Sequence, residues 1–99
     1  MVKPLSRILV IEDEPEMRRN LLTILKLEKF QPVGAENGRV GLAAVKRDKP
    51  DLILCDVMMP ELDGFEVCRR LRADRITTPI LFLTARDAVE AKVTGFGLR

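Results

Sequence analysis

Acidic side chains and one threonine stand directly after three short apolar runs of the sequence. These are Glu12, Asp13 and Glu14 after residues 7–11, Asp56 after residues 52–55, and Thr84 after residues 80–83. If the runs are neighbouring parallel strands, their carboxyl ends meet at one edge of the sheet and the side chains converge there. Carboxylates this close repel one another, and no Lys or Arg stands at the strand ends to neutralise them. A hard divalent cation relieves the repulsion, and Mg²⁺ suits a half-open site because it keeps several of its waters.

Helix capping is the alternative role for these acids. Asp13 or Glu14 alone could cap a helix that follows the first apolar run. Asp56 precedes a loop that contains Pro60 rather than a helix, so capping does not account for it. The spacing therefore favours a functional acidic cluster over a set of unrelated caps.

The elements that must position these side chains alternate between strands and helices. Apolar runs at residues 7–11, 33–35, 52–55 and 80–83 are typical of strands, three of them buried on both faces and the second one weak. Helix starts are indicated at Pro15, at the turn Asn37-Gly38, after Asp63 and after Asp87. This alternation predicts an α/β fold with a parallel sheet and helices on both sides.

Helical spacing also predicts which side chains each helix buries. The first helix is expected to bury Met17, Leu21, Ile24 and Leu25 and to leave Arg18, Arg19, Asn20 and Lys26 for solvent. The third helix is expected to bury Phe65, Cys68 and Leu71. The fourth is expected to bury Val89, Val93 and Phe96 and to end at Gly95-Phe96-Gly97. Each helix would thus offer one apolar side to the sheet.

The composition excludes several classes of function. The 99 residues include no His, which removes imidazole catalysis and His-ligated metals. The net charge of +2 and the absence of Trp and Tyr argue against nucleic acid as a direct partner. No apolar run is long enough to cross a membrane, and the N-terminus lacks the apolar segment of a secretory signal. We expect one cytoplasmic domain in which Cys55 and Cys68 are reduced thiols.

Four stretches of the sequence resemble the receiver domains of two-component response regulators. They are residues 8–15 (ILVIEDEP), 51–60 (DLILCDVMMP), 61–67 (ELDGFEV) and 79–87 (PILFLTARD). Their order and spacing match the family over essentially the whole chain. The resemblance implies a flavodoxin-like three-layer sandwich with strand order 2-1-3-4. The sequences of the second and fourth stretches look most like those of regulators that carry a winged-helix DNA-binding output domain.

The resemblance also implies the chemistry of the acidic residues. Asp56 would be the carboxylate nucleophile that accepts a phosphoryl group from a sensor histidine kinase. Glu12, Asp13 and Asp56 would hold Mg²⁺ together with the backbone carbonyl of Met58. The metal would be the main catalyst, because phosphoryl transfer needs alignment and charge neutralisation more than covalent help.

Further residues would sense the phosphorylated state. Thr84 would donate a hydrogen bond to the acyl phosphate and act as a switch, and Met58 and Arg86 would tune the lifetime of the phosphorylated form. On this view the domain is regulatory rather than an enzyme, since the only transfer it catalyses is its own phosphorylation, and it switches an output domain outside these 99 residues.

The chain departs from the family pattern near its end. Family members carry a fifth strand and a fifth helix there, with a Lys that pairs with the phosphoryl group, so about seventeen or more residues are missing. Arg86, Lys92 and Arg99 are the nearest cations, and helix-surface solvation accounts better for each. We expect residues 1–99 to be a C-terminally truncated receiver domain with impaired phosphorylation. Residues 80–83 would be an unprotected edge strand that favours a homodimer.

Other functions have weaker support. The main alternative is a receiver fold that serves as a non-phosphorylated interaction or dimerisation module, which phosphodonor labelling of Asp56 would distinguish. A nucleotide-binding domain would want Gly-x-Gly-x-x-Gly after the first strand, and this pattern is absent. A phosphatase would want a second acid two residues after Asp56, where Met58 stands. Direct DNA binding would rest on Arg69, Arg70, Arg72 and Arg75, for which a solvated helix face is the better explanation.

Overall fold

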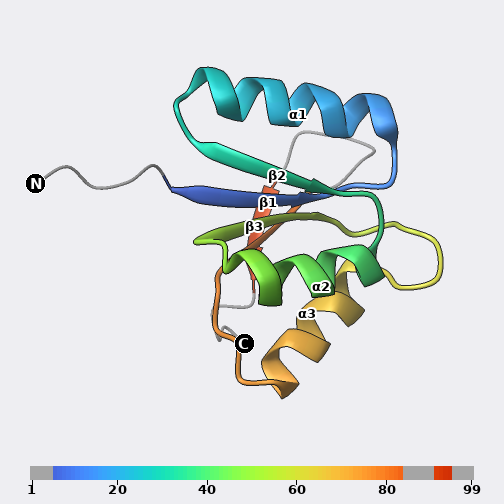
Figure 1. Cartoon of the computed structure of the whole chain (residues 1–99). Helices are drawn as coiled ribbons and strands as arrows, with labels where there is room; N and C mark the ends of the chain where they lie inside the picture. The colour runs from blue at the N-terminus through green and yellow to red at the C-terminus, as the bar shows by residue number, and fades with distance from the viewer. Residues whose placement is uncertain (1–5, 84–90, 95–99) are drawn as a thin grey trace, which may run out of the picture.

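A mixed β-sheet with helices on both faces forms the body of the molecule (Figure 1). The computed structural model describes residues 6–83 and 91–94. In chain order the described elements are β1 (Arg7–Ile11), α1 (Pro15–Leu27), β2 (Gln31–Ala35), α2 (Gly38–Asp48), β3 (Leu52–Asp56), α3 (Gly64–Ala73), β4 (Ile80–Leu83) and β5 (Ala91–Thr94). None of the helices among these residues is long and apolar enough to cross a bilayer.

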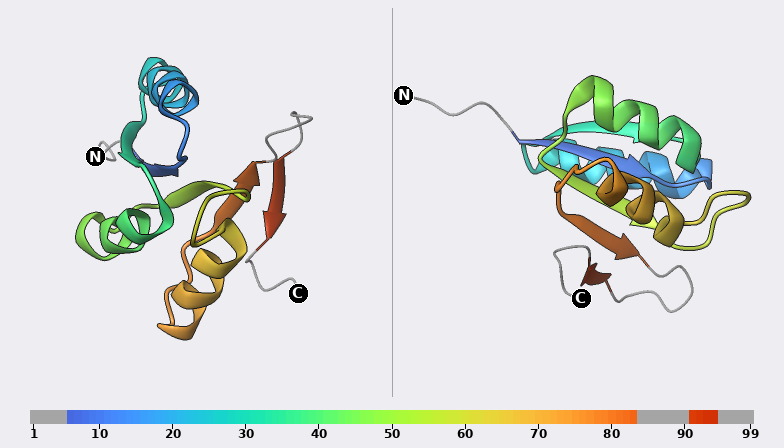
Figure 2. Two further views of the ribbon diagram at one scale, coloured as in Figure 1. Left: turned by 90° about the vertical axis from the view of Figure 1, so that its right-hand side faces the viewer. Right: turned by 90° about the horizontal axis from the view of Figure 1, so that it is seen from below.

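The strand order is β2-β1-β3-β4-β5, and the first four strands are parallel. Helix α1 covers one face of the sheet, while α2 and α3 cover the other (Figures 1 and 2). The predicted three-layer α/β architecture with parallel order 2-1-3-4 is therefore confirmed.

The far edge of the sheet differs from the prediction. Residues 91–94, expected within a fourth helix, form β5, which pairs antiparallel with β4 so that Leu81 lies opposite Val93. The β-branched Val93 and Thr94 suit a strand, and the pairing satisfies backbone groups of β4 that would otherwise be open. Because β5 pairs with β4, the prediction that β4 is an unpaired edge strand is wrong. The other residues predicted for this region lie outside the described residues: Thr84, Arg86, Asp87, Val89, Gly95, Phe96, Gly97 and Arg99.

The helix starts follow the sequence signals. Pro15 occupies the first turn of α1, where its missing N–H is not needed. Asn37 caps α2, because its side-chain oxygen accepts a hydrogen bond from the Val40 amide at 2.8 Å. Asp63 caps α3 in the same way, accepting from the Glu66 amide at 2.8 Å. These caps fix where each helix leaves the sheet edge that carries the acidic residues.

The core is divided by the sheet into two unequal clusters. The larger lies under α2 and α3 and includes Leu9, Ile11, Ile53, Cys55, Val67, Leu71, Ile80 and Phe82. The smaller, under α1, has Ile8, Val10 and Leu54 as its buried members, with Leu21, Leu22 and Leu25 partly buried against it. Both cysteines are free, as predicted, and burial raises the pKa of the Cys55 thiol to about 12.

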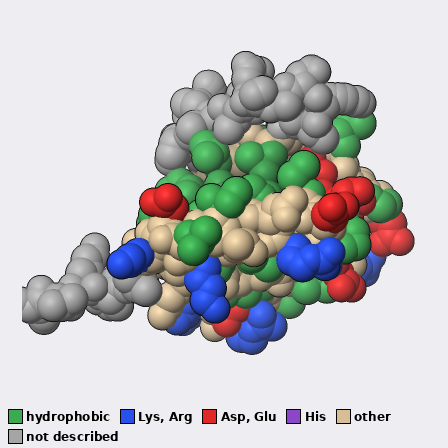
Figure 3. Space-filling view, turned by 90° about the horizontal axis from the view of Figure 1, so that it is seen from above, with side chains coloured by type: hydrophobic (Ala, Val, Ile, Leu, Met, Phe, Trp, Pro, Cys, Tyr) green, Lys and Arg blue, Asp and Glu red, His purple; other side chains and the backbone are tan. Residues whose placement is uncertain are grey.

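Three side chains predicted to be buried are exposed instead. Met17 and Ile24 of α1 are 42% and 54% exposed, because α1 is the sole described helix on its face and leaves part of that face open. Seen from the α1 side, hydrophobic side chains gather on the surface (Figure 3). Phe65 of α3 is 57% exposed, although its ring packs edge-on against Phe82 with the ring centroids 4.9 Å apart.

Candidate functional site

Three carboxylates converge at the carboxyl ends of two neighbouring strands. Glu12 and Asp13 follow β1 directly, and Asp56 is the last residue of β3. The two strands are parallel with Ile11 opposite Cys55, so the acids that follow emerge side by side. One oxygen from each of the three carboxylates lies within 4.8 Å of the others. The predicted convergence of Glu12, Asp13 and Asp56 is therefore found.

Backbone hydrogen bonds hold the turn after β1. The Glu12 amide donates to the carbonyl of Ala35 on β2 at 3.1 Å, which extends the sheet pairing by one residue. The Glu14 amide donates to Oε2 of Glu12 at 3.1 Å, which folds the side chain back over its own turn. The Glu12 carboxylate is thus held within the site.

Burial and mutual repulsion determine the electrostatics of the site. Glu12 and Asp56 are 5% and 3% exposed, whereas Asp13 is half-buried. Burial raises the pKa of Glu12 to about 7, with the negative charges of Asp56 and Asp13 adding to the rise and the Glu14 amide opposing it. Burial also raises the pKa of Asp56, opposed in part by the amide of Met58.

One oxygen of the site has no partner. Among the described residues, Asp56 Oδ1 is the buried side-chain polar atom that lacks a hydrogen bond. Burial, backbone amides and neighbouring carboxylates are the main influences on the pKa values of Glu12 and Asp56. Oxygen donors that are close together, buried and not neutralised match the ligands that Mg²⁺ takes in proteins.

The loop between β3 and α3 forms one side of the site. An open hollow of about 520 Å³ is lined by Val57, Met58, Met59, Pro60, Asp63 and Phe65. The loop folds back on itself, since the Gly64 amide donates to the Val57 carbonyl at 3.0 Å. A Cβ atom at Gly64 would lie 2.5 Å from the carbonyl oxygen of Asp56, so only glycine fits there. The Met58 side chain is exposed and its thioether is a poor ligand for a hard cation, so its backbone carbonyl is the part that could join a magnesium site.

One residue that contacts the site, Arg18, was not predicted from the sequence. Arg18 was expected to face solvent, but it is half-buried and its Nη1 donates to the backbone carbonyl of Glu12 at 2.8 Å. The signal was present in the helical spacing, because Arg18 precedes Leu22 by four residues and Leu25 by seven and therefore shares their side of α1.

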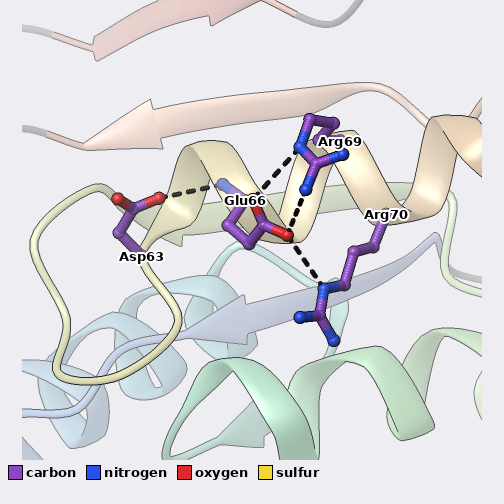
Figure 4. A network of polar contacts seen from close by, with 4 residues as sticks. All are labelled: Asp63, Glu66, Arg69 and Arg70. Carbon is purple, nitrogen blue, oxygen red and sulfur yellow. Dashed lines mark hydrogen bonds and ion pairs between the residues drawn. The ribbon is translucent and has the colours of Figure 1, made fainter.

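The arginines of α3 are engaged within the helix and the loop that follows it. The Glu66 carboxylate binds Arg69 at 2.6 Å and Arg70 at 3.0 Å (Figure 4). These contacts hold the pKa of Glu66 below its usual range. Arg72 donates to the carbonyls of Ile76 and Thr78. Arg69 and Arg70 thus lie on an exposed helix face, as predicted, whereas Arg72 is half-buried and holds the loop after α3.

Comparison with known proteins identifies the family. The model of the response regulator receiver domain matches residues 8–98. The chain belongs to this family. Over 89 residues it is 45% identical to the response regulator MprA of Mycolicibacterium vanbaalenii and 47% identical to the transcriptional regulatory protein TcrA of Mycobacterium tuberculosis. The match takes in 90% of this chain but only 38% and 35% of those two proteins.

Solved receiver structures share the fold. The N-terminal domain of a response regulator receiver protein from Methanoculleus marisnigri is 36% identical with a TM-score of 0.80, over 83% of this chain and 68% of that one. The response regulator TrrA of Thermotoga maritima, solved in complex with Mg²⁺-BeF, is 35% identical with a TM-score of 0.78, over 84% and 72%. The fold and family expected from the sequence motifs are thereby confirmed.

Proposed function

We propose that this receiver domain accepts a phosphoryl group on Asp56 from a sensor histidine kinase. In the transfer a carboxylate oxygen of Asp56 forms a bond to phosphorus. The P–N bond of the phosphohistidine breaks, and the released imidazole nitrogen keeps the electron pair and takes up a proton. The observation that carries the proposal is the cluster of Glu12, Asp13 and Asp56, in which a buried Asp56 oxygen lacks a partner.

The same residues fit a bound Mg²⁺. Glu12, Asp13 and Asp56 would hold the ion, with the Met58 carbonyl as the fourth protein ligand. When bound, the ion neutralises the phosphoryl oxygens. The complex of TrrA with Mg²⁺-BeF supports this assignment, since that receiver shares the fold.

The switch and tuning roles rest on sequence position. Leu83 lies opposite Asp56 in the pairing of β3 with β4, and Thr84 is the next residue in the sequence. We propose that Thr84 donates a hydrogen bond to the acyl phosphate, and that Met58 and Arg86 tune its hydrolysis. Met58 lines the hollow beside Asp56, where a hydrolytic water would approach.

The relatives support a regulatory partner and output. MprA is a response regulator and TcrA a transcriptional regulatory protein, and this chain spans little more than a third of either. We propose that the phosphorylated domain acts on an output domain of the winged-helix DNA-binding kind. A non-phosphorylated interaction module of receiver fold is the alternative, and it requires no transfer to Asp56.

Intact-mass measurement after incubation with Mg²⁺ and a small acyl phosphate tests the proposal. We expect a slow, Mg²⁺-dependent gain of one phosphoryl group, because among the described residues no donor reaches Asp56 Oδ1. Loss of one such donor costs about 3 kcal/mol of transition-state stabilisation in other enzymes. The gain should vanish in Asp56→Asn and persist in Glu61→Gln, an exposed acid of the same loop.

Two results would count against the proposal. A mass that stays constant after prolonged incubation would favour the interaction module, and labelling that persists in Asp56→Asn would move the acceptor elsewhere. A labelling rate equal to that of the MprA receiver domain, measured alongside, would contradict the expected slow transfer.

A further inference from the structure

Arg18 connects α1, β2 and the acidic turn. Its Nη1 donates to the Glu12 carbonyl at 2.8 Å. Its aliphatic stem passes over Gly34 of β2, where an added Cβ would lie 3.5 Å from Arg18 Cδ and 3.0 Å from Leu22 Cδ1. Arg19, the next residue, is exposed. The Arg18 side chain is therefore held at both its stem and its charged end, unlike its neighbour.

We propose that Arg18 is a positioning residue for the metal site. It binds the one backbone group of Glu12 that the sheet and the turn leave open. The Glu12 amide donates to the Ala35 carbonyl, and the Glu12 carboxylate accepts from the Glu14 amide. The hydrogen bond from Arg18 to the Glu12 carbonyl is the third that holds this residue. Hydrogen bonds to these three groups restrain the turn that also carries Asp13. This inference rests on the proposed Mg²⁺-dependent function.

The repulsion within the cluster explains why the turn needs such a hold. Without a cation, the three clustered carboxylates repel one another and favour an outward movement of the turn after β1. A hydrogen bond from a guanidinium is charge-assisted and stronger than one from a neutral donor. Arg18 keeps the ligands in place before the ion arrives, which lowers the reorganisation that binding requires.

Charge and position predict opposite effects at this site. By charge alone, a guanidinium close to the cluster repels Mg²⁺, so its removal would tighten metal binding. If the guanidinium instead positions the turn, its removal lets the turn relax and weakens Mg²⁺ binding. A side chain that merely attached α1 to the sheet would change the thermal stability and leave the affinity for Mg²⁺ unaltered. The sign of the change in affinity therefore separates the three roles.

Calorimetric titration with Mg²⁺ is the test, since the chain has no Trp or Tyr to report binding. We expect Arg18→Met, which keeps the apolar stem, to weaken binding about tenfold, the lower end of the effect seen when groups that orient metal ligands are removed. Arg18→Lys, which keeps a charged donor, should recover part of the loss. Arg19→Met is the matched control and should bind as the unaltered chain does.

The outcomes separate this inference from the function on which it rests. If the unaltered chain binds Mg²⁺, Asp13→Ala does not, and Arg18→Met binds equally or more tightly, Arg18 is not a positioning residue. If the unaltered chain does not bind Mg²⁺, or Asp13→Ala binds it equally, the proposed metal site itself is wrong. Should Arg18→Met fail to fold, Arg18→Gln is the second variant: its side chain has one methylene fewer and ends short of the Nη1 position that binds the Glu12 carbonyl, so an affinity equal to that of the unaltered chain would overturn the inference.

Discussion

At the scale of single residues, the acidic site combines burial with uncompensated charge. Glu12 and Asp56 are nearly inaccessible, and burial raises the pKa of both groups, that of Glu12 to about 7, with the charges of neighbouring carboxylates adding to the rise. Buried charges normally have a partner, so this arrangement is unfavourable in the metal-free protein. Binding of a divalent cation would turn the same repulsion into affinity.

Removing Asp13 should abolish Mg²⁺ binding. Asp13 is the half-buried member of the cluster, and the other two acids are held in place by strand ends and backbone bonds. With one carboxylate gone, the site loses both a ligand and a negative charge. Calorimetry on Asp13→Ala should detect no binding, whereas Glu16→Ala, an exposed acid in the first turn of α1, should bind normally. An unchanged titration curve for Asp13→Ala would contradict the assignment of Asp13 as a magnesium ligand.

The raised pKa of Glu12 predicts an unusual dependence of stability on pH. Its pKa is about 7 in the folded protein against 4.5 ordinarily, so the folded state binds this proton more tightly. The free energy of unfolding of the metal-free chain should therefore fall as the pH rises from about 4.5 to about 7, by up to about 3 kcal/mol from this group. Below that window the contribution is fully present, and above it the contribution is lost.

Chemical denaturation across this pH range measures the effect. Saturating Mg²⁺ should reduce the fall, because the ion stabilises the ionised carboxylate. Glu12→Gln should remove most of the slope, since it has no proton to release. Glu66 and Asp48, whose pKa values are lowered by neighbouring arginines, act at lower pH and in the opposite direction. A slope that survives in Glu12→Gln would assign the effect to another group.

At the scale of elements, capping side chains determine where the site loops end. Asp63 accepts from the Glu66 amide, while the Glu66 carboxylate turns to Arg69 and Arg70 instead of back to the cap (Figure 4). The loop that follows Asp56 thus ends at a fixed position, and Gly64 lets it approach the Asp56 carbonyl.

Loss of the Asp63 cap should destabilise the chain measurably. We expect Asp63→Ala to lower the free energy of unfolding by about 1 kcal/mol, because the Glu66 amide loses its acceptor. Glu61→Ala, whose side chain reaches Arg39 only through an exposed contact of 3.9 Å, is the control and should change stability little. Equal stability of the two variants in urea would mean that water replaces the cap without loss.

The elements that the sequence predicts well are those with a local signal. Pro15 and Asp63 mark helix starts by their own chemistry, and the apolar runs of β1 and β3 are followed by acids whose convergence depends only on strand adjacency. The predicted helix over residues 91–94 failed because pairing with β4, a tertiary contact, decides the conformation there. Arg18 was missed for a similar reason, since its role depends on a carbonyl across the turn.

At the scale of the whole molecule, the two faces of the sheet are covered unequally. Two described helices bury the larger cluster on one face, whereas α1 alone lies on the other and has no fully buried residue. Met17, Ile24 and Leu27 of α1 are all exposed, and Leu81 and Leu83 of β4 are only partly buried. An apolar surface of this kind commonly marks a site of association.

We predict that the chain self-associates through this face rather than by pairing of β4 edges, because β5 occupies that edge. Each large apolar side chain that an interface buries fully contributes about 1.5–3 kcal/mol. Light scattering over a range of concentrations should show a dimer that dissociates on dilution.

Two variants test whether α1 lies in the interface. Ile24→Glu should shift the dimer to a monomer, because a buried unpaired carboxylate is strongly unfavourable. Thr23→Glu, at the exposed neighbouring position, should leave the dimer intact. A monodisperse monomer at every concentration would refute self-association, and equal effects of both variants would place the interface on another surface.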